Sequence, residues 1–309
     1  MTMINLRNVF IVGAAKSGTT ALYYLLSQHP QICGPVVKEP NYFSNIDNTS
    51  DPAKPGNGPG DGSTVWTKDL KEYHRLYSPG NTHKAKLDAS VSYLYSTTAA
   101  SKIAAYDSES TIIMVLRNPV DRAFSHYKHL LRDGRETLSF PQAIDHEQNR
   151  IQKNWEFSWH LTSMGRYHDQ LCRYFDHFKQ EQIRIFLFED IINDIAAIIH
   201  EVTDLIGLEP HEYNFDQQER NASGVARIWV LSRLVNWILG YKATINKVIS
   251  PKLTHRALQL FRSVNIRKDD LDIPDGLRDR LYLSFETDIA KTEQLIGRNL
   301  NAWRPPRHE

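Results

Sequence analysis

The chain has 309 residues, and 41% of them are hydrophobic, which is enough to bury the core of one large domain or of two small ones. Its 37 lysines and arginines nearly balance its 36 aspartates and glutamates, and the net charge is +1. This balance excludes an overall field that would draw the protein to nucleic acid or to an anionic membrane. We therefore expect any anion site to be built locally.

Neither the hydropathy pattern nor the cysteines indicate export or membrane insertion. The apolar run at residues 9–12 is too short for a secretory signal. The longest apolar stretch, residues 228–239, is interrupted by polar side chains and falls short of the ~20 residues of a membrane span. Cys33 and Cys172 are the two cysteines, and their spacing suggests neither a disulfide framework nor a zinc site. We expect a soluble, cytoplasmic protein.

Strand patterns alternate with helix patterns along the chain. Strands are predicted at residues 9–13, 111–116 and 183–188, and the helices that follow them at residues 20–28, 122–131 and 191–206. This alternation predicts an α/β fold, with a central, mostly parallel sheet flanked by helices on both faces.

Two stretches depart from this alternation. Residues 51–62 hold four glycines and three prolines, so we predict a flexible surface loop at about 47–64, either a lid over a site or a plain insertion. Residues 223–264 have a helical, basic and aromatic-rich pattern that suits an acceptor-side wall or lid. Trp229 and Trp237 within it could also form a homodimer or a substrate contact. No linker divides the chain, so we expect one domain over residues 1–309.

The segment after the first strand has the composition of a phosphate-binding loop. Five consecutive residues would contribute, namely Lys16, Ser17, Gly18, Thr19 and Thr20. Glycine lets the backbone approach an oxyanion, the lysine adds charge, the hydroxyls donate, and the helix start adds roughly half a positive charge. An ordinary tight turn is the alternative. The lysine precedes the second glycine, unlike in a Walker A loop, and no strand ends in an acid placed to hold magnesium.

A second anion motif follows the strand at residues 111–116. This strand delivers Arg117 to its C-terminal end, where α/β sheets bind ligands. Pro119 sets the turn into the next helix, which brings Ser125 back toward Arg117. Arg122 is left open between an anion contact and an ion pair that locks the turn.

These motifs resemble those of the sulfotransferases that use 3′-phosphoadenosine 5′-phosphosulfate (PAPS), particularly the bacterial and Golgi heparan-sulfate-type branch, which have a P-loop-like fold. In that family a loop similar to KSGTT binds the 5′-phosphosulfate. The resemblance implies that Arg117 and Ser125 bind the 3′-phosphate, which PAPS shares with the product adenosine 3′,5′-bisphosphate (PAP). A stretch similar to the family's closing loop adds Ser223, Gly224 and Arg227. The run at 281–303 is similar to the family's last helix and tail.

The resemblance also assigns the chemistry. Lys16 would neutralise charge on the leaving phosphate, with no metal required. Glu39, in a segment similar to the family's KEPxxF element, would be the general base. From the spacing alone, a solvated Lys38–Glu39 pair before the turn at Pro40 is the alternative. His126 is the rival base, because histidine does this work in the cytosolic branch.

The resemblance to this family also suggests which residues would contact the acceptor. The segment 86–94 is similar to the family's second acceptor element, except that Ala89 stands where the Golgi enzymes carry lysine. The candidate acceptor contacts are Lys38, Tyr42, Asp88, Ser90, Tyr93 and His126. We expect sulfation of a hydroxyl or nitrogen on a small, natural-product-like molecule, a secondary metabolite, rather than on a long glycan. A P-loop kinase or ATPase and a non-catalytic nucleotide-binding module are the alternatives.

Overall fold

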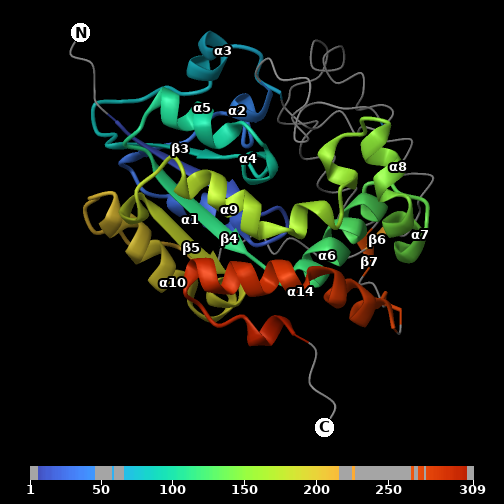
Figure 1. The fold of residues 1–309 in the computed structure, drawn as a ribbon. Coiled ribbons are helices and arrows are strands. Elements are labelled where there is room, and N and C mark those ends of the chain that lie inside the picture. Colours follow the sequence, from blue (N-terminus) through green and yellow to red (C-terminus); the bar gives the residue numbers. More distant parts are fainter. Residues whose placement is uncertain are drawn as a thin grey trace.

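The protein is represented by a computed structural model that describes residues 6–45, 58, 66–215, 225–226, 266–267, 271–274 and 276–304. Its centre is a five-stranded sheet with the strand order β2-β3-β1-β4-β5 (Figure 1). The strands are β1 (Arg7–Gly13), β2 (Ile32–Cys33), β3 (Ala85–Ala89), β4 (Thr111–Leu116) and β5 (Ile183–Leu187). All four pairings are parallel, which confirms the predicted α/β class.

Helices surround this sheet (Figure 1). They are α1 (Thr19–Leu26), α2 (Tyr42–Asn45), α3 (Leu70–Arg75), α4 (Ser92–Tyr95), α5 (Ala99–Tyr106), α6 (Pro119–Arg132), α7 (Phe140–Asp145), α8 (Glu147–Gln152), α9 (Tyr167–Phe175), α10 (Phe188–Leu205) and α14 (Leu277–Ile296). A two-residue antiparallel ribbon joins β6 (Val225–Ala226) to β7 (Ile266–Arg267). None of the helices in the described part of the chain combines the length and apolarity that crossing a membrane requires.

The two faces of the sheet are buried by different helices. Val9 and Ile11 of β1 belong to a core formed with α1 and α10. Phe10 and Val12 belong to a second core, formed with α4, α5, α6, α9 and α14. This alternation follows from the two-residue period of a strand, and it gives the three layers that the sequence predicts.

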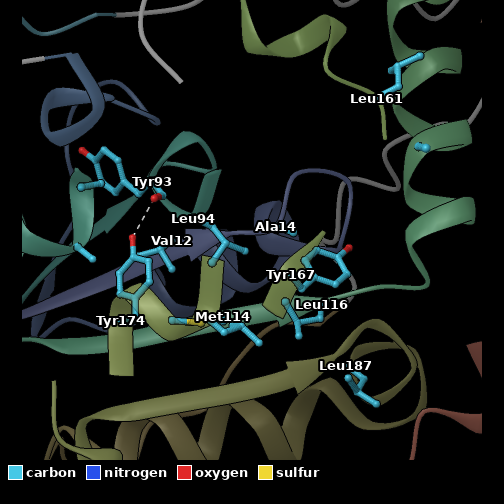
Figure 2. Close-up of a cluster of buried hydrophobic side chains, with 14 of the residues drawn as sticks. Val12, Ala14, Tyr93, Leu94, Met114, Leu116, Leu161, Tyr167, Tyr174 and Leu187 are labelled. Carbon is cyan, nitrogen blue, oxygen red and sulfur yellow. Dashed lines mark hydrogen bonds between the residues drawn. The ribbon is translucent and has the colours of Figure 1, made fainter. Parts of the chain in front are cut away.

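Helix α4 lies unusually close to the end of β1. Figure 2 shows Leu94 beside Val12 and Ala14. A Cβ atom on Gly13 would lie 2.7 Å from the Cβ of Leu94, so only glycine fits there. The Tyr174 hydroxyl of α9 donates to the Tyr93 carbonyl at 3.0 Å, which fixes the other side of α4 (Figure 2).

The observed boundaries correct the prediction in several places. The residue predicted to end the third strand, Phe188, instead begins α10, and α1 ends at Leu26. Helix α6 begins at Pro119 rather than near residue 122, because the Asn118 side chain accepts from the amides of Val120 and Asp121 and proline suits the first helical turn. Strand β3 was not predicted, since its sequence AKLDA carries two charges, yet all five residues are buried. The predicted loop at 47–64, Gly58 apart, and the helical region at 223–264, apart from β6, lie outside the described residues.

Candidate active site

The two predicted anion motifs meet at the carboxyl edge of the sheet. The loop after β1 and the start of α6 after β4 lie side by side, because β1 and β4 are neighbouring parallel strands. The Ala14 amide donates to the Val115 carbonyl at 2.7 Å. The Arg117 guanidinium donates through Nη1 to the Lys16 carbonyl at 3.0 Å. Arg117 therefore supports the phosphate loop directly as well as standing beside it.

The phosphate loop has the geometry of an anion nest. Lys16 and Gly18 have φ angles of 68° and 90°, in the left-handed region, and a non-glycine residue there is strained. No side chain caps α1, and no acidic residue occupies its first turn, which includes Thr19 and Thr20. The Ser17 hydroxyl is fully buried and has no hydrogen-bond partner within the described residues. A phosphate or sulfate group would satisfy these donors, so the loop fits the 5′ end of PAPS.

The Lys16 ammonium is a partly desolvated cation. Burial above all, together with the nearby charges of Arg132 and Arg117, lowers the pKa of Lys16 to about 8, while Asp133 and Glu39 oppose that shift. An anion bound beside it would favour its charged form. Arg117 and Glu39, which the sequence analysis singled out, thus both lie close enough to act on Lys16.

The planar guanidinium of Arg117 is held in place and is suited to an anionic partner. Its guanidinium stacks on the Phe188 ring at 4.3 Å, and burial lowers its pKa. Among the described residues no carboxylate forms an ion pair with it. Ser125 lies two turns into α6 and is partly exposed. The positions of Ser125 and Arg117 are thus compatible with a 3′-phosphate site.

The third predicted anion segment is described only in part. Ser223, Gly224 and Arg227 lie outside the described residues. The two residues between them form β6, whose backbone lies against α6. The closing loop therefore stays a prediction, with its centre beside the helix that carries Ser125.

Glu39 lies in a short turn, and its charge acts on Lys16. Its φ angle is 56°, again in the left-handed region, and its carboxylate side chain is 35% exposed. The Lys38 ammonium is 2.5 Å from Glu39 Oε1 and 5.7 Å from the centre of the Tyr23 ring. The Lys–Glu pair that spacing alone predicts is thus present, and it is partly buried rather than fully solvated.

Three of the predicted acceptor contacts are buried behind this turn. Asp88, Ser90 and Tyr93 have exposures of 0%, and the Asp88 carboxylate accepts from the hydroxyls of both other residues. Tyr42 is also buried, stacked on Tyr73 at 4.9 Å between ring centres. Ser90 and Tyr93 face the core, because their hydroxyls satisfy the buried Asp88 carboxylate.

His126, the rival base, is equally enclosed. It is 4% exposed, and its Nδ1 accepts from Arg122, which is a donor only. Burial and the Arg122 charge hold the pKa of His126 well below its usual value. Arg122 also donates to the Leu161 carbonyl, so it binds neutral groups rather than the carboxylate of an ion pair. Both side chains serve the packing of α6.

Sequence reasoning missed Arg132 and Asp133 at the end of α6. Both act on the pKa of Lys16, Arg132 more strongly than any other charge. The Arg132 guanidinium donates to Asp133 at 3.1 Å and to His129. A signal was available: His126, His129 and Asp133 are spaced by three and four residues, so they share one helix face.

Comparisons with known proteins agree with this geometry. A family model described as the sulfotransferase domain matches residues 6–224. The crystal structure of a sulfotransferase from Alicyclobacillus acidocaldarius is 31% identical and has a TM-score of 0.71, with 97% of this chain and 99% of that chain covered. Human heparan sulfate glucosamine 3-O-sulfotransferase 3B1 is 27% identical over 204 residues, which are 66% of this chain and 47% of that protein. The mouse bifunctional heparan sulfate N-deacetylase/N-sulfotransferase 4 is 25% identical over 227 residues, 70% of this chain and 24% of that protein.

The chain thus spans about half the length of the 3-O-sulfotransferases it matches and about a quarter of the bifunctional enzyme. The family match covers well over half of this chain, and the solved structure covers nearly all of it. The chain belongs to the PAPS-dependent sulfotransferase family, as the position of Lys16 before Gly18 indicates.

Proposed function

We propose that this protein transfers a sulfuryl group from PAPS to a hydroxyl or a nitrogen of a small-molecule acceptor, with Glu39 as the general base and Lys16 stabilising the leaving phosphate. The observation that carries the proposal is the set of complementary groups in one short loop. Consecutive residues supply a desolvated lysine, an unpartnered buried hydroxyl and an uncapped helix start, and the charge of Glu39 is near enough to act on the lysine.

The residues divide between the two ends of the nucleotide. Lys16, Ser17, Gly18, Thr19 and Thr20 would hold the 5′ end, because they supply backbone donors, hydroxyls and a charge. Arg117 and Ser125 would hold the 3′-phosphate, together with Ser223, Gly224 and Arg227. PAPS, when bound, supplies the activated sulfuryl group.

Two of these residues would act on the transfer itself. The Lys16 ammonium stabilises negative charge where the phosphate leaves, without moving during the reaction. The Glu39 carboxylate accepts the proton of the attacking hydroxyl or nitrogen. Within the described residues no cluster of three or more His, Cys, Asp or Glu side chains is arranged to hold a metal ion. Metal-independent transfer stays a prediction.

The acceptor class is inferred from weaker signals. A long anionic glycan would require a basic groove, whereas the chain has a net charge of +1 and Ala89 where the Golgi enzymes carry lysine. The relatives named for heparan sulfate make a glucosamine-containing polysaccharide the matched alternative acceptor. Cys33 and Cys172 are both free thiols, in agreement with a reducing cytoplasm. We treat residues 1–309 as one domain, and a homodimer is not part of the proposal.

The test begins with nucleotide selectivity. PAP without magnesium should raise the melting temperature of the protein, whereas ATP with magnesium should not. Transfer from radiolabelled PAPS is then measured with small phenols, alcohols and amines and, in parallel, with a desulfated heparan polysaccharide. Stabilisation by ATP with magnesium but not by PAP would instead support a kinase or ATPase. Tight PAP binding with no transfer to any acceptor would support a non-catalytic binding module.

A further inference from the structure

A buried carboxylate lies directly behind the turn that carries Glu39. Asp88, near the end of β3, is fully buried, and its carboxylate accepts from three hydroxyl groups. Ser90 donates to Oδ1 at 2.8 Å, while Tyr93 and Tyr73 donate to Oδ2 at 2.9 and 3.0 Å. An ionised carboxylate only accepts, so it fixes the direction in which each hydroxyl points its hydrogen.

The direction of these hydroxyls decides what they can do for the Glu39 turn. Because the Ser90 hydrogen points to Asp88, its oxygen is free to accept from the Asn41 amide, which lies 3.1 Å away. The Tyr93 oxygen is likewise turned to accept from the Phe43 amide at 3.5 Å, a longer contact. A donor in place of either carboxylate oxygen would remove the acceptor of a hydroxyl hydrogen. That hydrogen would then be unsatisfied in the core or would turn toward the backbone amide, and either arrangement disturbs the contact to the Glu39 turn.

Asn41 links these hydroxyls to Glu39 through hydrogen bonds. Its side-chain Oδ1 accepts from the Ser92 hydroxyl at 2.6 Å, and its Nδ2 donates to the Glu39 carbonyl at 2.8 Å. Glu39 and Asn41 have φ angles of 56° and 51°, so this turn is strained and relies on its surroundings to keep its shape. The Pro40 carbonyl between them accepts from the Thr67 amide at 3.0 Å.

We propose that Asp88 is a positioning residue for the reaction: through Ser90 and Asn41, its carboxylate holds the Glu39 turn in place without touching either substrate. The inference rests on the proposed function, because it takes Glu39 as the base. It replaces the expectation that Asp88, Ser90 and Tyr93 contact the acceptor, since all three are buried. It predicts a loss of turnover from a residue that no substrate reaches.

The test is a double-mutant cycle between Asp88→Asn and Glu39→Gln. Asp88→Asn keeps the size of the side chain but turns one acceptor into a donor. It should lower kcat roughly 10- to 100-fold, the effect of misplacing a reacting group by about 1 Å, and leave the affinity for PAP within about twofold. In the Glu39→Gln background, Asp88→Asn should change the residual rate by no more than about threefold, because there is no base left to misplace.

Tyr77→Phe is the matched control. Its hydroxyl lies in the same aromatic cluster and donates to Tyr73 at 3.4 Å, but it reaches neither Asp88 nor the Glu39 turn. This variant should retain full kcat. If Asp88→Asn does not fold, Ser90→Ala and Asn41→Asp replace it in the cycle, because each breaks one link between Asp88 and Glu39.

Two outcomes would overturn the inference. Asp88→Asn with unchanged kcat would show that Glu39 is held without it. An equal loss of rate in both backgrounds would show that Asp88 acts independently of Glu39. Full turnover of Glu39→Gln alone would instead remove Glu39 as the base and refute that part of the proposed function, so the two failures are distinguishable.

Discussion

The nucleotide side and the acceptor side of the site are built in opposite ways. On the nucleotide side, the described residues leave polar groups unused: the Ser17 hydroxyl has no partner, and the start of α1 is uncapped. On the proposed acceptor side, the Asp88 carboxylate accepts from three hydroxyls. The Asn41 side chain accepts a hydrogen bond through its oxygen and donates one through its nitrogen. A bound ligand would satisfy the free groups of the proposed nucleotide side, whereas the groups around Asp88 already satisfy one another.

This difference suggests that one group of residues binds the nucleotide and the other positions the reacting side chain. Groups that wait for a ligand gain their partners only when it binds, so their loss should appear in affinity. Groups that are already bonded to one another fix a reacting side chain before any substrate arrives, so their loss should appear in turnover. The predictions below test that separation, from the largest expected effect to the smallest.

Glu39→Gln should lower turnover by roughly 10²- to 10⁴-fold and leave PAP binding intact, because the amide cannot accept the acceptor's proton. Steady-state kinetics and isothermal titration with PAP measure the two quantities. Glu109→Gln is the control, since Glu109 is exposed in the turn before β4, at the opposite edge of the sheet. A Glu39 variant that loses PAP affinity as well would show that the two sides are not separable.

Arg117→Ala should weaken PAP binding by about 1.5–3 kcal/mol, the contribution of a charge-assisted hydrogen bond, which is roughly 10- to 150-fold in Kd. The loss should be much smaller for adenosine 5′-phosphate, which has no 3′-phosphate. Arg184→Ala, at the amino-terminal end of β5 and paired with Glu201, should bind PAP normally. Equal losses for both nucleotides would mean that Arg117 acts only through its hydrogen bond to the Lys16 carbonyl.

Nucleotide binding should take up protons near pH 8. The pKa of Lys16 is lowered by burial to about 8, and a bound anion raises it again, so the affinity for PAP should fall as the pH rises through about 8. At pH 8 up to about half a proton per site should be taken up. Titration calorimetry in buffers of different ionisation enthalpy measures this number. Lys16→Arg, which stays charged, should abolish the uptake; uptake that persists in this variant would assign the proton to another group.

The sequence was sufficient for the parts of the site that rest on local patterns. The phosphate loop and the position of Arg117 follow from strand-loop-helix patterns, and the structure brings both to one edge of the sheet. The end of β4 at Leu116 was also predicted to the residue. Such features depend on neighbours in the chain, which periodicity and turn chemistry describe well.

Features that depend on distant partners were not predictable in the same way. Strand β3 has the sequence pattern of a polar segment because it contains Lys86 and Asp88. The rings around Lys86 and the hydroxyls around Asp88 that make their burial possible come from other elements of the chain. Resemblance placed Asp88 on the acceptor side, but it could not show that the side chain points inward. The effect of the Arg132 charge on the pKa of Lys16 depends on the length of α6, which places the two residues near each other.

Helix α4 contacts both the phosphate loop and the residues behind the Glu39 turn. Three consecutive side chains of this one helical turn reach both sides: Ser92 bonds to Asn41, Tyr93 bonds to Asp88, and Leu94 packs on Gly13 at the start of the phosphate loop. In the proposed mechanism, the donor site and the base would therefore be aligned by a single helical turn. Any side chain introduced at Gly13 would push this turn away, and an in-line attack tolerates such misalignment poorly.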